Sequence, residues 1–330
     1  MRKKLIMGIE STAHTFGIAI IDSDFNILSD IRRVYPFETG KGIHPQKAAE
    51  HHSSIAQEVL SEAIENSGIS VTDLDGFAYS CGPGLGPSLR IGATVTRTLT
   101  HYLKKPIYPV HHGIGHIELA SKLTQSDNPL VILVSGGHTA ITAFNQGNWR
   151  IYGETLDIPI GNLFDQFARK SGLSSPGGPI IEKMAKSGSK ILDLPYTVKG
   201  NNMFFSGLMT SVLKYLPSED IADVCYSLQE VAFSMLVESS ERGLTQLNRE
   251  EVVLAGGVAS NNRLQEMMKD MVDEHDVKIG FADRKYNGDN GVQIAIVGLY
   301  MHLHKNYFPL EKADIRQRWR LDEVDIPWRK

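Results

Sequence analysis

Short apolar runs separated by small polar turns occur in the same order at two places along this 330-residue chain. The first set comprises apolar runs at residues 4–10 and 16–21 and a more polar third segment at residues 27–34, which also reads as a strand. The runs of the second set lie at residues 130–134, 140–144 and 149–152. Short continuous apolar runs bounded by turn residues are typical of buried strands. The pattern therefore predicts two copies of one plan, each opening with a three-stranded meander.

The first turn of each meander is made of small residues. It contains Ser11, Thr12 and Ala13 in the first copy and Ser135-Gly136-Gly137-His138-Thr139 in the second. Glycine lets a ligand approach the backbone closely, and the exposed N–H groups of such turns bind phosphate. Two ordinary hairpin turns would give the same pattern in either copy taken alone. The repetition favours two turns that grip a phosphate chain.

Apolar residues at helical spacing predict helices over residues 44–66 and 223–247, and another helix from Arg90 onward. Residues 252–255 form an apolar run that leads through a glycine turn into a helix near Asn262, which is a generic phosphate-binding arrangement. These elements predict a mixed α/β fold of two similar halves with a ligand between them. We expect the lobes at residues 1–128 and 129–330, with the C-terminal segment packing back on the N-terminal lobe.

Composition narrows the class of protein. Hydrophobic residues make up 42% and charged residues 22% of the chain, which excludes intrinsic disorder. Only Cys81 and Cys225 are present, too few for a disulfide framework, so we expect a reducing compartment. No apolar stretch approaches the ~18 residues of a membrane span, and we expect a cytoplasmic protein. The net charge of −4 argues against a dedicated nucleic-acid-binding domain.

His112 and His116 are four residues apart, a spacing that on a helix puts both imidazoles on one face. That is the geometry of a metal-binding pair, although a solvated or core pair of histidines has the same spacing. A metal site also needs a carboxylate, and the best candidate is Asp289 in a polar glycine turn before an apolar helix. Asp289 is equally well suited to cap that helix.

Several other polar residues have two interpretations each. Asp165 and Glu182 suit ribose hydroxyls, which need an acceptor, but they also suit helix caps or the surface. The glycine- and proline-rich segment at residues 80–88 either closes over a ligand or connects a strand to a helix. The basic tail is interleaved with acidic residues, as on a solvated face. Its members are Arg316, Arg318, Arg320, Arg329 and Lys330. Trp319 and Trp328 either serve a partner surface or anchor the tail to the core.

Many short motifs follow one another in a fixed order. They are Gly8–Thr15, Gly42–Pro45, His51-His52, Gly82–Gly84, His112–Glu118, Val134–Gly137, Gly153–Asp157, Pro176–Pro179, Ser206–Leu208, Cys225–Glu230, Gly256–Val258 and Asp289–Gly291. Over essentially the whole chain this series resembles the universal tRNA N6-adenosine threonylcarbamoyltransferase family. The resemblance implies the actin/Hsp70/sugar-kinase-like (ASKHA) fold, with two duplicated lobes and a nucleotide cleft between them. Residues 316–324 resemble the archaeal and eukaryotic branch, the catalytic subunit of the KEOPS complex.

The resemblance implies a reaction and its site. The family transfers a threonylcarbamoyl group from threonylcarbamoyl-AMP to N6 of the adenosine beside the anticodon, in tRNAs that read codons beginning with A. His112, His116 and Asp289 match the ligands of one divalent ion, iron or zinc. The positions that match contacts to the adenylate, or to ATP and AMP analogues, are Leu133, Val134, Ser135, Gly136, Gly137, Asp165, Gly178, Glu182 and Asn261. AMP is a good leaving group, so the enzyme mainly has to position two substrates, and we assign no general base. The implied partners are tRNA and KEOPS subunits, including a small atypical protein kinase.

The chain departs from the family pattern at three places. Leu133 stands where many archaeal relatives have a Tyr close to the metal, which leaves the fourth coordination position to water or substrate. His138 stands where the archaeal pattern often has Asn. Val292 and Gln293 replace a frequent Ala-Met pair, for which we expect a change of packing. Some archaeal relatives also continue into a kinase domain, whereas this chain ends at Lys330, so we expect a kinase to come separately or to have been removed.

Three other functions are compatible with parts of the pattern. A kinase of the same superfamily would use both glycine turns but needs no His-x-x-x-His pair. A metallopeptidase would need the H-E-x-x-H motif, in which Gly113 here replaces the catalytic Glu. A nucleotide-gated scaffold would bind metal only incidentally. If the substrate is tRNA, the acidic net charge predicts weak binding by this subunit alone, with phosphate contacts from a local patch and from partners.

Overall fold

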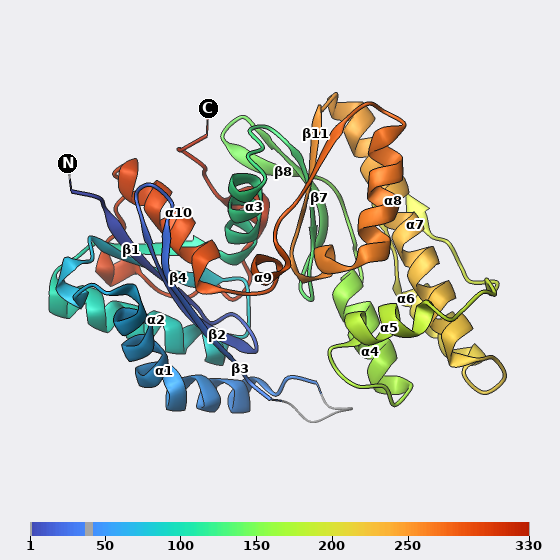
Figure 1. Ribbon diagram of the computed structural model, residues 1–330, viewed down its shortest axis with the longest axis horizontal. Helices are drawn as coiled ribbons and strands as arrows, with labels where there is room; N and C mark the ends of the chain where they lie inside the picture. The colour runs from blue at the N-terminus through green and yellow to red at the C-terminus, as the bar shows by residue number, and fades with distance from the viewer. Residues whose placement is uncertain (1, 37–41, 330) are drawn as a thin grey trace. The chain divides into compact units, whose positions relative to one another are not determined.

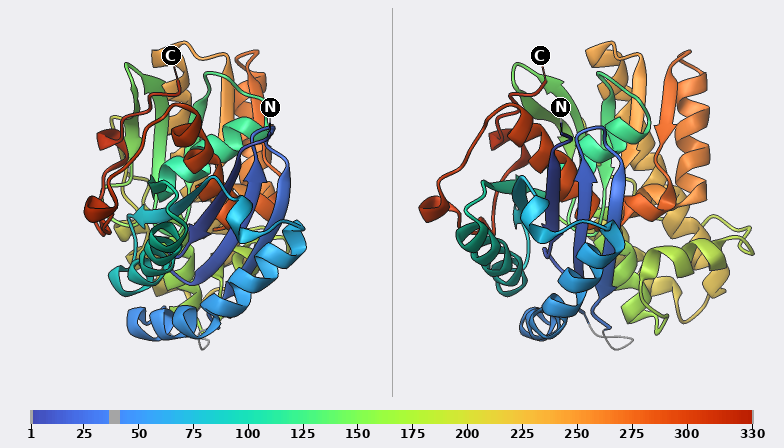
Figure 2. Two further views of the ribbon diagram at one scale, coloured as in Figure 1. Left: turned by 90° about the vertical axis from the view of Figure 1, so that its left-hand side faces the viewer. Right: turned by 60° about the vertical axis from the view of Figure 1, so that its left-hand side comes forward.

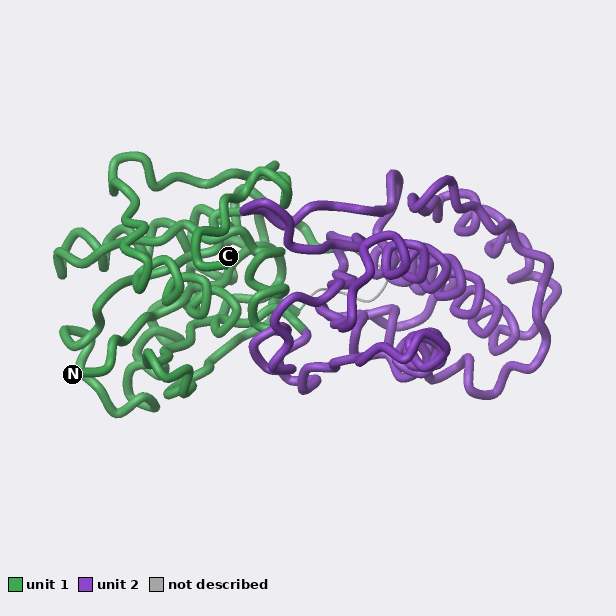
Figure 3. The backbone as a smooth tube through the Cα atoms, turned by 90° about the horizontal axis from the view of Figure 1, so that it is seen from above, with its two compact units in different colours: residues 1–37, 42–119, 288–330 green, residues 38–41, 120–287 purple. Residues whose placement is uncertain are grey.

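The two predicted meanders are present, one in each of two compact units (Figure 3). The computed structural model describes residues 2–36 and 42–329, so Lys330 of the basic tail lies outside the described residues. The first unit comprises the described residues among 1–37, 42–119 and 288–330, and the second comprises residues 120–287. The lobe boundary expected at residues 128 and 129 stays a prediction.

The sheet of the first unit has five strands in the order β3-β2-β1-β4-β5 (Figure 1). The strands are β1 (Leu5–Glu10), β2 (Thr15–Asp22), β3 (Ile27–Val34), β4 (Gly76–Gly82) and β5 (Ile107–His111). β1, β2 and β3 are antiparallel, whereas β4 and β5 continue the sheet in parallel with β1. All six residues of β1 and all eight of β2 are buried, as expected for the centre of a covered sheet.

Helices cover both faces of this sheet (Figure 2). They are α1 (Pro45–Ser67), α2 (Gly86–Leu103), α3 (His112–Leu123), whose last residues belong to the second unit, and α10 (Gly291–Leu303). A Cβ on Gly8 would lie 2.2 Å from the backbone nitrogen of Ala295 in α10, whereas a Cβ on Gly92 of α2 would lie 3.6 Å from Ile9. Successive strand residues point to opposite faces, so α10 and α2 pack on opposite sides of β1. Gly8 is needed because any side chain there would displace α10.

The second unit repeats the same sheet topology. Its strands are β6 (Leu130–Val134), β7 (Thr139–Asn145), β8 (Asn148–Glu154), β11 (Glu251–Ala255) and β12 (Lys278–Phe281), with a separate small pair, β9 (Val198–Lys199) and β10 (Asn202–Met203). β6, β7 and β8 form an antiparallel meander, and β11 and β12 continue it in parallel with β6. The order β8-β7-β6-β11-β12 therefore matches β3-β2-β1-β4-β5 strand for strand. The prediction of two copies of one plan is confirmed.

The helices of the second unit build its core. They are α4 (Ile160–Lys170), α5 (Gly177–Ala185), α6 (Ser206–Val212), α7 (Ile221–Leu247), α8 (Asn262–Asp273) and α9 (Arg284–Asn287). The long helix α7 contributes buried residues such as Leu228, Phe233 and Leu236 to one continuous hydrophobic cluster with β6 and α4. Short 3-10 turns complete the chain at residues 71–73, 213–215, 257–260, 310–312 and 321–323. None of the described helices is both long enough and apolar enough to cross a membrane.

The structure bears on two interpretations of the sequence. Helix α2 begins at Gly86 and not at Arg90, because Pro87 occupies its first turn, where a missing N–H costs nothing. The segment at residues 80–88 is thus mostly the end of β4 and the start of α2. The tail anchors to its own unit: Trp328 stacks on Tyr300 at 5.8 Å, and Arg329 pairs with the buried carboxylate of Glu118 at 2.9 Å.

Candidate functional site

The predicted metal-binding side chains lie together in the first unit. His116 Nε2 is 3.3 Å and His112 Nε2 is 3.4 Å from the same oxygen, Oδ1 of Asp289. The two imidazole rings are nearly perpendicular, with centroids 4.7 Å apart. One donor atom from each residue lies within 4.8 Å of the others, so the three can hold one metal ion. Two neutral imidazoles and a carboxylate suit zinc and other borderline metals.

Local folding explains why residues far apart in sequence meet here. Strand β5 ends at His111, and α3 starts directly at His112, so both imidazoles project from the first turns of one helix. A Cβ on Gly115 would lie 2.9 Å from the carbonyl oxygen of Gln293, which shows how closely α3 approaches the start of α10. The cap of α10 is Asn290, whose Oδ1 accepts a hydrogen bond from the Gln293 backbone nitrogen at 3.0 Å. Asp289 is therefore not the helix cap, and its carboxylate faces the imidazoles.

Electrostatic interactions among the buried histidines and carboxylates stabilise the metal-ligand group. Burial lowers the pKa of His112, but the nearby carboxylates Glu10 and Asp289 outweigh it and raise that pKa to about 10. Burial lowers the pKa of His116. Burial opposes ionisation of Asp289, yet the two histidines hold the pKa of its carboxyl well below its usual range. In the absence of metal, a proton on His112 supplies the positive charge beside the carboxylates. Metal binding must displace this proton from the nitrogen that becomes the ligand.

Most residues matched to the adenylate lie in the second unit around a turn at the end of β6. Leu133 and Val134 are fully buried, and the side chain of Leu133 offers no donor atom. The hydroxyl of Ser135 accepts hydrogen bonds from the backbone nitrogens of Gly137 at 3.2 Å and His138 at 3.0 Å. Those two N–H groups therefore stabilise the turn itself. Gly136 and Gly137 are exposed, and a Cβ at either position would meet no atom within 4 Å among the described residues.

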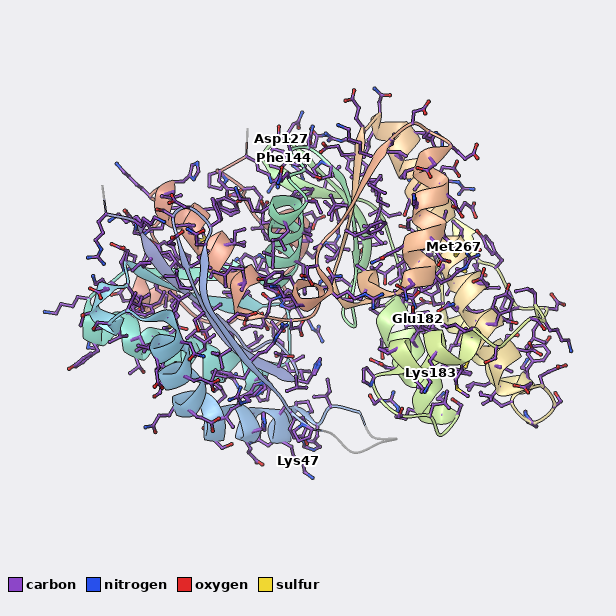
Figure 4. All side chains as sticks on the ribbon, in the orientation of Figure 1. Lys47, Asp127, Phe144, Glu182, Lys183 and Met267 are labelled. Atoms are coloured by element: carbon purple, nitrogen blue, oxygen red, sulfur yellow. The ribbon has the colours of Figure 1, made fainter. Side chains whose placement is uncertain are left out.

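Asp165 and Glu182 both accept hydrogen bonds at the starts of helices. Asp165 Oδ1 accepts from the backbone nitrogen of Gly177, at the start of α5, at 2.7 Å. Glu182 lies on α5 (Figure 4), and its Oε1 accepts from the backbone nitrogen of Asn262 at 3.0 Å and from its side-chain amide at 2.8 Å. Of the two interpretations of each residue, the structure shows the helix-terminal one directly.

Asn261 and Gly178 complete the predicted set. Asn261 caps α8 by accepting from the Leu264 backbone nitrogen at 3.1 Å, and its amide donates to Gln229 at 3.1 Å. Gly178 has open space at its Cβ position, with only a ring carbon of Phe164 at 4.0 Å. The second unit thus brings together capped helix N-termini and an exposed glycine turn. Helix N-termini and such turns are where phosphate groups bind.

Sequence reasoning missed three contacts to Nδ1 of His112, one of them from the Thr12 hydroxyl at 3.4 Å. Glu10 Oε2 lies 3.0 Å from His112 Nδ1, and the side-chain amide nitrogen of Gln293 lies 3.1 Å from the same atom. The side chains of Glu10 and Gln293 are fully buried. The available signals were a lone carboxylate at the end of an apolar strand and a lone amide in an apolar helix. A buried charge is costly unless it is paired, and a buried amide is costly unless it is hydrogen-bonded. Each of the two positions therefore implied a partner.

Comparison with solved structures identifies the fold. HypF from T. kodakarensis aligns with a TM-score of 0.64 at 15% identity, covering 92% of this chain and 48% of that one. Component A of the (R)-2-hydroxyglutaryl-CoA dehydratase of Acidaminococcus fermentans aligns with a TM-score of 0.56 at 14% identity, covering 95% and 99%. At such identities the likeness concerns the fold alone, and it confirms the predicted ASKHA-type α/β fold.

Comparison with curated proteins identifies the family. A tRNA N6-adenosine threonylcarbamoyltransferase of Thermofilum pendens is 46% identical over 331 residues, covering 100% of this chain and 98% of the relative. A second protein of that name, from Pyrobaculum islandicum, is 46% identical, covering 98% and 97%. A probable bifunctional tRNA threonylcarbamoyladenosine biosynthesis protein of Thermoplasma volcanium is 48% identical, and this chain spans 61% of its length. Residues 26–296 match the TsaD family, and the chain therefore belongs to the tRNA N6-adenosine threonylcarbamoyltransferases.

Proposed function

We propose that this chain transfers the threonylcarbamoyl group of threonylcarbamoyl-AMP to N6 of the adenosine beside the anticodon, in tRNAs that read codons beginning with A. The N6 nitrogen forms a bond to the carbamoyl carbon, the bond from that carbon to the phosphate oxygen breaks, and AMP leaves. N6 loses one proton to solvent. The observation that carries the proposal is 46% identity over the full length of proteins that bear this name.

The first unit provides a fitting metal centre. His112, His116 and Asp289 would hold one divalent ion, iron or zinc, through two imidazole nitrogens and one carboxylate. Such an ion supplies Lewis-acid polarisation of a substrate oxygen. The chain's own contribution is to fix the donors before substrate arrives, since all three side chains are held by one another. Three protein ligands leave the remaining coordination positions to water or substrate.

The second unit provides the adenylate site in this proposal. The exposed turn at Gly136 and Gly137 offers room for a phosphate, because no side chain fills that space among the described residues. Asp165, Glu182 and Asn261 already hold helix starts in place, which fixes the backbone that an adenylate would contact. Positioning is the main requirement, because the leaving group is already activated.

We further propose that the chain works in the cytoplasm with KEOPS subunits, including a small atypical protein kinase. Support comes from the bifunctional name and greater length of the Thermoplasma volcanium relative, of which this chain spans 61%. The net charge of −4 supports a need for partners, because tRNA binding depends on cationic contacts to phosphate. Alone, the chain is expected to bind tRNA weakly and with strong salt dependence.

The test is a nucleoside assay under reducing, metal-replete conditions. The chain, its partner subunits, threonylcarbamoyl-AMP and an unmodified tRNA reading an A-starting codon are incubated, and digested nucleosides are measured by mass spectrometry. We expect threonylcarbamoyladenosine and an equal amount of AMP. A transcript with guanosine in place of the target adenosine is the matched control and should give neither product. Absence of the modified nucleoside with the first tRNA would refute the proposed function.

A further inference from the structure

The buried carboxylate of Glu10 contacts a member of the metal-ligand group without being one of the three ligands. It ends strand β1, its side chain is fully buried, and its Oε2 lies 3.0 Å from Nδ1 of His112. The opposite ring nitrogen, Nε2, is the one that faces Asp289. Glu10 therefore contacts His112 from behind, on the side away from the other ligands.

Glu10 is held in this position by its own chain. Its Oε1 accepts hydrogen bonds from the backbone nitrogen and from the hydroxyl of Thr12, both at 2.6 Å. The following strand end is fixed as well, because the Ser11 backbone nitrogen donates to the Ser80 hydroxyl of β4 at 2.9 Å. The carboxylate thus has a defined direction, with one oxygen on Thr12 and the other on His112.

This contact decides which nitrogen of His112 keeps its proton when a metal ion displaces the other. A carboxylate only accepts hydrogen bonds, so an unprotonated Nδ1 would place two lone pairs against each other. With a metal ion bound, Nδ1–H would donate to Glu10 and the lone pair of Nε2, on the side of Asp289, would be left for the ion. Metal-ligating histidines commonly hold their second nitrogen in this way, through a carboxylate or carbonyl partner.

Gln293 offers a competing contact at the same nitrogen. Its amide nitrogen lies 3.1 Å from Nδ1 of His112, and its Oε1 accepts from the Asn290 side chain at 3.3 Å. A donor at that place would favour the other tautomer, with the lone pair on Nδ1. A hydrogen bond to an ionised carboxylate is about twice as strong as one between neutral groups. The contact with Glu10 therefore outweighs the contact with Gln293. Gln293 is thus more than the packing change expected from the sequence, yet its effect should be the smaller one.

We propose that Glu10 is the positioning residue of the metal centre: it holds His112 as an Nε2 ligand and provides, with Asp289, the second negative charge that matches a divalent cation. The proposal rests on the metal centre of the proposed function and not on its tRNA substrate. Its consequence is that metal affinity depends on a side chain that never touches the metal.

The test measures metal affinity directly, without tRNA or adenylate. Metal-free protein is titrated with Zn²⁺ against a competing chelator, and with Co²⁺ while the visible absorption of the bound cobalt is recorded. Glu10→Gln keeps the size of the side chain but removes its charge, and we expect affinity for both ions to fall about 10–100-fold, with a changed cobalt spectrum. Gln293→Met is the matched control, because it removes the other buried polar group at the same nitrogen. Its affinity should stay within about threefold of the parent.

Each outcome decides the proposal. Parent-like affinity and an unchanged cobalt spectrum in Glu10→Gln would overturn it, and so would equal losses in both variants, which would assign the effect to burial of polar groups in general. If Glu10→Gln does not fold, Thr12→Val replaces it, since it releases one of the two hydrogen bonds on Oε1 and the 3.4 Å contact of the Thr12 hydroxyl with Nδ1 of His112. Parent-like affinity and spectrum would then overturn the proposal. A parent that binds neither ion would also overturn it. The nucleoside assay is independent: loss of affinity in Glu10→Gln beside a parent that modifies no tRNA would leave this proposal standing and refute the proposed function.

Discussion

The metal-ligand group of the first unit and the glycine turn of the second unit are built in opposite ways. His112, His116 and Asp289 present side-chain donors that already contact one another, with both imidazoles buried and the carboxylate half-buried. Gly136 and Gly137 present backbone with open space beside it. A small ion needs donors fixed to within tenths of an ångström, whereas a phosphate needs room and a rigid backbone. The first region should therefore be sensitive to the loss of side chains, and the second to their addition.

The largest expected effect is loss of the metal. Replacing Asp289 with Ala removes the oxygen that both imidazoles face, together with one of the two negative charges around His112. Because changes behind a ligand already cost 10–100-fold in affinity, loss of a ligand should cost more than about 100-fold. Metal content after equilibrium dialysis, read by mass spectrometry of the elements, measures this.

An exposed carboxylate of the same unit controls for charge alone. Asp325→Asn should retain the parent's metal content, and both variants should show the parent's circular dichroism. Full retention of metal by Asp289→Ala would show that the three side chains are not the metal-ligand group, and the contrast between the two regions would lose its first half.

The second prediction compares two variants that each add a methyl group at the glycine turn, Gly161→Ala and Gly136→Ala. A Cβ on Gly161 of α4 would lie 2.6 Å from the Ser135 carbonyl oxygen and 2.9 Å from the Gly136 nitrogen. Gly161→Ala must therefore push the turn away, and overpacking of this kind costs about 2–3 kcal/mol of unfolding free energy. Gly136→Ala meets open space and should leave stability unchanged while weakening AMP binding. Urea unfolding and titration calorimetry with AMP separate the two effects.

Equal stability of the two alanine variants would contradict this prediction, because it would mean that the turn adjusts freely. Undiminished AMP affinity in Gly136→Ala would instead remove the turn from the adenylate site. The two measurements thus test the rigidity and the openness of the turn independently.

The bounds of strands were predictable where turn residues lie on both sides. β3 and β6 have the predicted bounds, because each is a run closed by turn residues on both sides. The start of α2 was placed four residues late because Pro87 is equally common in loops and in the first turn of a helix. The duplicated topology followed from the order of runs alone, since each copy keeps its meander before its helices.

The polar contacts were harder to predict. Asp289 and Asn290 are adjacent and both suit a helix cap, and only their backbone geometry shows that Asn290 takes that role. The contact between Glu10 and His112 joins residues 102 apart in sequence, and spacing carries no signal at that distance. Asp165 and Glu182 were candidates for two roles, and the hydrogen bonds to Gly177 and Asn262 show one of them without testing the other.

The smallest predicted effect is a pH dependence of the stability. It tests how far the buried hydrogen-bond network around Glu10 and Thr12 extends in the first unit. His52 of α1 is fully buried, and its Nε2 lies 3.0 Å from the carbonyl oxygen of Ala13, next to Thr12. Burial lowers the pKa of His52 to about 4. The unfolded chain, with a pKa near 6.5, therefore takes up a proton that the folded chain refuses, so stability falls as the pH drops through 6.5 and stops falling below about 4. Between pH 7.5 and 5.0 this loss is about 2 kcal/mol.

The variant His52→Gln isolates the contribution of His52 to the pH dependence of stability from the contributions of the other titrating groups. The amide of Gln can still donate to Ala13 but has no proton to gain, so the variant should lose about 2 kcal/mol less than the parent between pH 7.5 and 5.0, measured by urea unfolding. The turn of the second unit is held by the Ser135 hydroxyl, which does not titrate in this range. Hydrogen exchange at pH 5.0 should accordingly show the amides of β1 and β2 regaining protection in the variant, with those of β6 and β7 unchanged. An identical pH dependence in parent and variant would mean that His52 is protonated in the folded state, and the network behind the metal-ligand group would then be open to solvent like the glycine turn.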